Sequence, residues 1–143
     1  MSETYTMQQP NAADVPYAGT RLVVLMYDGA IGALNKGLAA IEAGDLEGRC
    51  KAINMAMDIL AQLCMALYFE KGGQIATNLN DLYRFMIGRL VRANLLNDPV
   101  PARDVLRLLE TLYAAWRTLD ERMVTEYANR EAARPAPALR AVG

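Results

Sequence analysis

The sequence predicts an all-α fold, an antiparallel up-down four-helix bundle, from two observations. Apolar residues recur every three or four positions through four long segments, which is the period of an amphipathic helix, and no segment alternates with the strand period of two. The joints between these segments are short, and short connections favour antiparallel neighbours. We expect a mobile N-terminal arm over 1–17, with or without a short extra helix, a bundle domain over 18–127 and a disordered tail over 128–143.

The first two helices are expected over about 18–43 and 45–69. Gly44 can adopt the left-handed conformation that ends a helix, and Asp45 can then cap the next one. Gly29 lies inside the first helix, where glycine costs about 1 kcal/mol relative to alanine. We therefore expect close packing of Gly29 against another helix or against a bound chain.

The third and fourth helices are expected over about 73–96 and 100–126. Gly72 and Gly73 precede the third helix, where one glycine can adopt positive φ and the other lets the backbone reverse closely. The pair predicts a tight turn between two helices. Asp98, followed by two prolines, supplies a cap and the early-turn residues of the fourth helix.

Composition excludes several classes of function. The net charge of -1 provides no basic surface for nucleic acid, and the chain contains no histidine, the commonest general base and metal ligand. Carboxylates are scattered over polar faces and helix ends. We therefore expect no catalytic residues, no metal site and no cofactor, and we do not expect an enzyme.

The cysteines and the N-terminal sequence indicate a cytoplasmic protein. Cys50 and Cys64 lie 14 positions apart in one expected helix, roughly 21 Å, which is too far for a disulfide. The N-terminal residues lack the basic and apolar regions of a signal peptide, and no apolar run approaches the roughly 18 residues of a membrane span. We expect a soluble chain without membrane insertion.

The expected helices carry more apolar residues than a narrow bundle stripe needs. A second row runs beside the main one in the first three helices, and the chain contains 8 methionines, whose flexible side chains suit adaptable binding surfaces. A wide core-facing side explains the second row. It is also explained by surfaces that receive a partner's amphipathic segment.

Several motifs in order resemble the FliS family of flagellar secretion chaperones. The segment from Glu70 to Met86, "EKGGQIATNLNDLYRFM", is similar to that family's EKGG-centred signature. Further similar motifs, spread over residues 22 to 119, are "LMYDGAI" at 25–31, "AMDILAQL" at 56–63, "RLVRANLLND" at 89–98 and "LLETLYAAW" at 108–116.

The resemblance implies a cytosolic helical bundle that binds the disordered C-terminal region of flagellin, blocks premature polymerisation and delivers the subunit to the flagellar export gate. It also implies an N-terminal arm that can cover part of the client surface. By this analogy and by the second apolar rows, client contacts are expected at Leu22, Tyr27, Met55, Ile59, Leu63, Tyr83 and Ile87.

The chain departs from the family pattern at three places. The segment from Pro16 to Gly19 replaces a Thr-Ala-Ser-Pro-like cap before the first helix. Met55 stands where the family commonly has lysine, and Tyr68 where it commonly has aspartate. The last two changes make this version more apolar, which suits an altered client surface or a surface for self-association.

Three alternatives stay open at this stage. The surplus rows could make a self-associating helical bundle, a homodimer without any client. For the chain itself we expect a monomer or a weak homodimer. The chain could also be a chaperone of a different secretion client. A helical enzyme that binds a cofactor is the third alternative, disfavoured by the absence of histidine.

Overall fold

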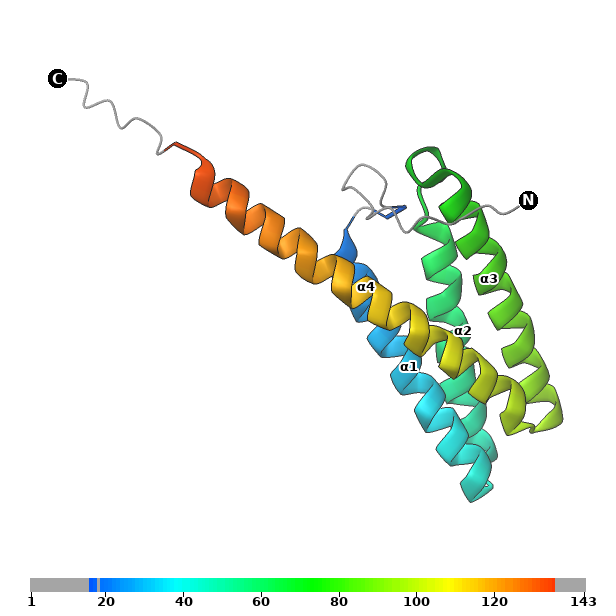
Figure 1. Cartoon of the computed structure of the whole chain (residues 1–143). Coiled ribbons are helices and arrows are strands. Elements are labelled where there is room, and N and C mark those ends of the chain that lie inside the picture. Colours follow the sequence, from blue (N-terminus) through cyan, green and yellow to red (C-terminus); the bar gives the residue numbers. More distant parts are fainter. Residues whose placement is uncertain (1–15, 18, 136–143) are drawn as a thin grey trace.

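Four helices form a bundle in the structure, a computed structural model that describes residues 16–17 and 19–135. They are α1 (Thr20–Ala43), α2 (Leu46–Met65), α3 (Phe69–Leu96) and α4 (Pro99–Ala133). α1 and α3 each pack against both α2 and α4. Figure 1 shows α1, α2 and α3 running up and down beside one another, while α4 crosses them obliquely. The predicted all-α four-helix bundle is confirmed.

Local chemistry forms two of the joints as predicted. Gly44 has φ of 71°, and its left-handed backbone ends α1. The carboxylate of Asp45 accepts a hydrogen bond from the amide of Gly48 at 2.9 Å, and the carboxylate of Asp98 accepts one from Val100 at 3.0 Å. These caps satisfy amides that have no partner at the start of α2 and α4.

The connection between α2 and α3 differs from the predicted tight turn. α2 ends at Met65 rather than near residue 69, and residues 66–68 form a short non-helical link. α3 then begins at Phe69, and its first turn ends at Gly73. Gly73 breaks that helix at φ 51°, ψ -127°, so its expected positive φ is present inside α3 and not in a turn. The early exit from α2 has a tertiary cause, because the amide of Tyr68 donates to the carbonyl of Pro16 at 2.7 Å.

α4 is longer than predicted. It continues to Ala133, so the expectation of a disordered segment from 128 is wrong for 128–133, and residues 136–143 lie outside the described residues. Figure 1 shows this end of α4 projecting away from the other helices. Once a helix exists, each further residue adds a hydrogen bond without a new nucleation cost, and the extension consists largely of good helix formers.

The core lies where the four helices face one another. Its largest fully buried side chains are Tyr27, Tyr83, Leu34, Ile53, Leu60, Leu63, Met86, Leu90, Leu109, Val23, Val105 and Pro101. By length and composition α1 could cross a membrane, but it is the helix that contributes Val23, Tyr27 and Leu34 to this core. The same apolar residues therefore have a place inside the bundle.

The end of the expected arm belongs to the bundle. Tyr17 is 5% exposed and its ring meets Trp116 edge-on, with centroids 5.4 Å apart. The arm predicted over 1–17 therefore ends before Pro16, and everything expected of residues 1–15 lies outside the described part of the chain. α1 itself begins without a side-chain cap from Gly19, and the buried carboxylate of Asp120 accepts a hydrogen bond from the hydroxyl of Thr20 at 2.8 Å.

Candidate partner-binding surface

Three of the seven expected contact residues lie inside the core. Tyr27, Leu63 and Tyr83 are each 0% exposed, so their assignment to a client surface is wrong for this conformation. Leu63 packs in the hydrophobic core, and hydrogen bonding lets the two tyrosines be buried as well. The hydroxyls of Tyr27 and Tyr83 lie 2.6 Å apart and satisfy each other away from water.

Tyr17 completes a tyrosine cluster with Tyr27 and Tyr83. Its hydroxyl donates to the backbone carbonyl of Leu63 at 3.0 Å and lies 3.1 Å from the hydroxyl of Tyr83. Burial raises the pKa of all three phenols above the ordinary value of 10.0. The cluster therefore remains neutral and joins the N-terminal segment to α1, α2 and α3.

The other four expected residues remain accessible, and three of them lie along α1 and α2. Leu22 and Met55 are exposed, at 61% and 55%, and Ile59 is half-buried. Leu25, which the sequence analysis did not single out, is also exposed at 57%. Its position three residues after Leu22 places both on one side of α1, and this spacing could have identified it.

A contact between the helices brings these side chains to the same surface. A Cβ atom added to Gly29 would lie 3.2 Å from Cδ1 of Ile59. On α1, Leu22 and Leu25 lie two turns and one turn before Gly29, on the same side of the helix. On α2, Met55 lies one turn before Ile59. These side chains therefore lie along the edge where α1 and α2 meet. The packing explanation of Gly29 is thus confirmed.

Gly32 lies one turn beyond Gly29 and has no such explanation. It is exposed, it is helical, and a Cβ atom added to it would meet nothing within 4 Å. No contact within the described chain therefore requires glycine at position 32 of α1. We name Leu22, Leu25, Gly32, Met55 and Ile59 the α1–α2 strip.

Ile87 lies on a different side of the bundle. It is half-buried on α3, three residues after Arg84 and seven before Asn94, a spacing that places the three on one face. The amide oxygen of Asn94 accepts a hydrogen bond from Arg49 of α2 at 3.2 Å, so this face meets α2. The expected contact residues thus divide between the α1–α2 strip and the α2–α3 side.

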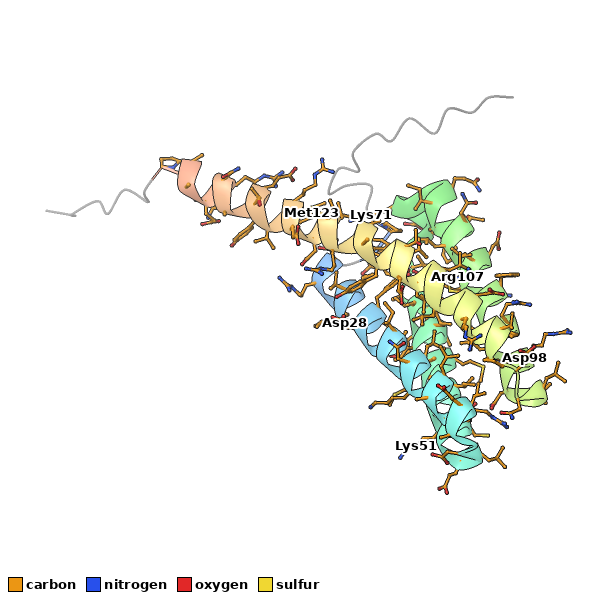
Figure 2. The ribbon with its side chains drawn as sticks, turned by 60° about the horizontal axis from the view of Figure 1, so that its bottom comes forward. Asp28, Lys51, Lys71, Asp98, Arg107 and Met123 are labelled. Carbon is orange, nitrogen blue, oxygen red and sulfur yellow. The ribbon has the colours of Figure 1, made fainter. Side chains whose placement is uncertain are left out.

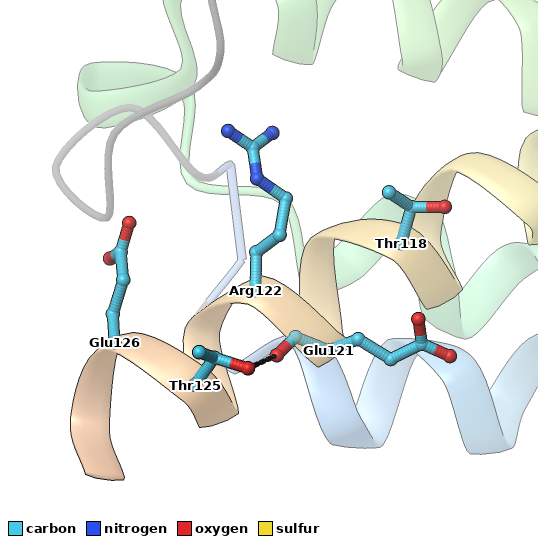
Figure 3. Close-up of a pocket in the computed structure, with 5 residues that line it drawn as sticks. All are labelled: Thr118, Glu121, Arg122, Thr125 and Glu126. Carbon is cyan, nitrogen blue, oxygen red and sulfur yellow. Dashed lines mark hydrogen bonds between the residues drawn. The ribbon is translucent and has the colours of Figure 1, made fainter. Parts of the chain in front are cut away.

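Two cavities lined by described residues lie away from both surfaces. One, of about 340 Å³, is lined by Thr118, Glu121, Arg122, Thr125 and Glu126, and Figure 3 shows that all of these side chains come from α4. Another, of about 440 Å³, lies between the end of α1 and the start of α4, with Leu38, Ile41 and Pro99 in its lining. A broad apolar strip suits a polypeptide better than a small ligand, which needs an enclosed site.

The strong polar contacts hold helices together. Arg89 of α3 and Arg107 both bind the carboxylate of Asp104 on α4, and their hydrogen bonds lower its pKa. Hydrogen bonding to the Asp28 carboxylate raises the pKa of the Tyr113 hydroxyl, which links α1 to α4. Figure 2 shows Asp28 and Arg107 on these two helices. Among residues 16–17 and 19–135 no three His, Cys, Asp or Glu side chains form a group suited to a metal ion.

Comparison with known proteins gives one consistent family. The sequence model of the flagellar protein FliS family matches residues 2–123. A flagellar secretion chaperone FliS from Salmonella typhimurium is 35% identical over 118 residues, which is 82% of this chain and 87% of that protein. A flagellar secretion chaperone FliS from Vibrio cholerae is 34% identical over 113 residues, 79% of this chain and 80% of that protein. A flagellar secretion chaperone FliSB from Pseudomonas aeruginosa is 35% identical over 96 residues, 67% of this chain and 76% of that protein.

Proposed function

This chain belongs to the flagellar protein FliS family, and on that premise we propose that it is a cytoplasmic export chaperone for flagellin. It binds the C-terminal region of flagellin, prevents that region from polymerising early and presents the subunit to the flagellar export gate. The chaperone has no reaction of its own in this scheme. Binding replaces a self-assembly contact of the client with a contact to the bundle.

The observation that carries the proposal is the open position of Gly32 in the α1–α2 strip. Glycine inside a helix costs about 1 kcal/mol relative to alanine. At Gly29 that cost accompanies a close contact with Ile59, but at Gly32 nothing in the described chain lies within 4 Å. A client backbone lying against α1 at Gly32 supplies the missing reason.

The strip has the chemistry that such a client needs. Its apolar side chains come from two neighbouring helices, so an amphipathic segment can lie along the strip with its apolar residues against Leu25 towards one end and Met55 towards the other. The unbound segment is disordered, and burial of apolar surface offsets the entropy lost when it becomes ordered. The exposed thioether of Met55 adapts to different side chains without a fixed rotamer.

The test separates a gain in stability from a loss in binding. Gly32→Ala should raise the free energy of unfolding by about 0.5–1 kcal/mol, because the added methyl meets no neighbour and alanine favours the helix. The same variant should bind a flagellin C-terminal segment at least tenfold more weakly in calorimetric titration. Thr111→Ala on α4 is the matched control, because Thr111 is exposed, lies outside the α1–α2 strip and is also replaced by a better helix former. It should raise stability without changing the affinity.

Two kinds of failure can be told apart. Heat from the flagellin segment that is the same for wild type and Gly32→Ala would reject the strip and leave the client assignment standing. The absence of heat with folded wild type, both for intact flagellin and for flagellin lacking its C-terminal segment, would reject the client. A different secretion client or a self-associating bundle would then be the better explanation.

A further inference from the structure

Two exposed lysines lie where the α1–α2 strip ends. Lys36 follows Gly32 by four residues on α1, and Lys51 precedes Met55 by four residues on α2. Each therefore continues the face of its helix that carries the strip. The positions three and seven residues beyond Lys36 on the same face of α1 are alanines. The large apolar side chains of the strip thus stop at Lys36 and Lys51, which we name the lysine pair.

The packing of α1 on α2 brings the two lysines to the same level. A Cβ atom added to Gly37 would lie 3.6 Å from Cβ of Ala52 and 3.2 Å from Cγ1 of Ile53. Lys36 directly precedes Gly37, and Lys51 directly precedes Ala52. Figure 2 shows Lys51 at the end of the bundle where α1 and α2 are joined. Two long, flexible cationic side chains therefore lie beside one contact, on the outer side of the helix pair.

The charge of the lysine pair is not used within the described residues. Among residues 16–17 and 19–135, neither Lys36 nor Lys51 forms an ion pair. Glu47 precedes Lys51 by four residues, the spacing at which helical ion pairs form, yet the two side chains are not paired. Asp45, the next nearest carboxylate in the sequence, is engaged as the cap of α2. Both ammonium groups are thus available to a bound chain.

We propose that the lysine pair binds the C-terminal carboxylate of the flagellin client, whose final segment lies as a helix along the α1–α2 strip. The inference rests on the proposed function, to which it adds a direction and an end point. From Leu22 to Lys36 the strip covers 14 positions of α1, roughly 21 Å, which fits a client helix of about four turns. The client then runs in the same direction as α1.

Helix electrostatics decide which end of the client meets the lysine pair. The C-terminal end of a helix carries partial negative charge on its unpaired carbonyl groups, and a terminal carboxylate adds a full charge. Asp58 is exposed on α2 seven residues after Lys51, so the strip is cationic at the lysine pair and anionic farther along. Arg21, beside Leu22 at the far end, already pairs with Asp120 at 3.4 Å. The positive N-terminal end of the client helix therefore lies towards Asp58 and Leu22.

Calorimetric titration of the full chain with a flagellin C-terminal segment tests the lysine pair. Lys36→Glu and Lys51→Glu should each weaken binding about three- to tenfold, since each reversal replaces attraction with repulsion at an exposed position. Arg130→Glu is the matched control, because it makes the same change of charge at an exposed position of α4 outside the strip. It should change the affinity by less than about twofold. Circular dichroism confirms that each variant is folded.

Amidation of the segment identifies the anionic group. A segment that ends in a C-terminal amide should bind wild type about three- to tenfold more weakly than the free acid does. In the double variant Lys36→Gln, Lys51→Gln, amidation should no longer weaken binding, because no cation remains to recognise the carboxylate. Equal binding of the amide and the free acid to wild type would overturn the assignment to the C-terminal carboxylate and favour an acidic side chain of the client.

A spin label on the client tests the direction. In nuclear magnetic resonance spectra of the complex, a nitroxide near the C-terminal end of the segment should broaden the amide signals of Lys36 and Lys51 most strongly. A nitroxide near the N-terminal end should instead broaden those of Leu22 and Leu25. The reversed pattern would overturn the proposed direction.

Failure of the lysine pair and failure of the client assignment give different results. Equal affinity of wild type and both charge reversals for the free-acid segment would overturn the lysine pair and leave the client assignment standing. An equal loss of affinity in Arg130→Glu would also overturn it, because net charge and not the strip would then explain the effect. No heat from the segment with folded wild type would overturn the client and the lysine pair together.

Discussion

Removal of the Tyr17 side chain should loosen the end of the bundle where α2 stops. Its hydroxyl donates a hydrogen bond to the backbone carbonyl of Leu63. In a continuous helix the amide of Leu67 would donate to this carbonyl, but here that amide donates to the carbonyl of Cys64 at 3.3 Å. Tyr17→Phe leaves that buried carbonyl without a donor, which costs about 1–2 kcal/mol. Tyr17→Ala also removes the ring that packs on Trp116, for a total of about 3–5 kcal/mol.

Urea unfolding followed by circular dichroism measures both changes as shifts in the midpoint at constant slope. The total free energy of unfolding of such a domain is about 5–15 kcal/mol, so the alanine variant should lose a large part of it. Tyr68→Phe is the matched control, because Tyr68 is 46% exposed, and it should change stability by less than about 0.5 kcal/mol. Equal midpoints for wild type and Tyr17→Ala would refute the argument, since they would mean that Tyr17 is not packed in the core.

Two further predictions concern pH and the backbone. Burial raises the pKa of each phenol in the tyrosine cluster, so the folded state holds these protons more tightly than the unfolded state does. The stability that the three phenols contribute is therefore complete well below pH 10 and is lost as the pH rises through it, by about 4 kcal/mol in all between pH 9 and 11. Tyr27→Phe should remove about a third of this loss. A flat profile from pH 9 to 11 in denaturant titrations would contradict the prediction. Gly73→Ala should lower the free energy of unfolding by about 1–3 kcal/mol, because φ of 51° with ψ of -127° suits glycine alone. The loss should be larger than for Gly44→Ala, because Gly44 lies in the ordinary left-handed region. Equal melting temperatures for the two variants would contradict this prediction.

The helices and their caps could be predicted because their causes are local. Asp45 and Asp98 bond amides two or three residues away, and Gly44 ends α1 through its own φ. Chemistry of this range is visible in a short stretch of sequence.

The candidate surface could be predicted only in part, because burial depends on distant residues. Tyr83 is exposed or buried according to whether its hydroxyl finds a partner, and its partners lie 56 and 66 positions away in the sequence. Periodicity identifies an apolar row but does not say which neighbour covers it. Leu22 and Met55 are exposed because none of the four described helices covers these two side chains.

The contact between Thr20 and Asp120 sets an order of events during synthesis. The two residues are 100 positions apart, and Trp116, whose ring Tyr17 contacts edge-on, lies only four residues before Asp120. At about 5–20 residues per second, the ribosome needs roughly 5–20 seconds to make the stretch between them. For that time the start of α1 has neither its buried carboxylate nor the ring that covers Tyr17. The nascent chain can pair α1 with α2, but it closes this end of the bundle only when its last helix has emerged.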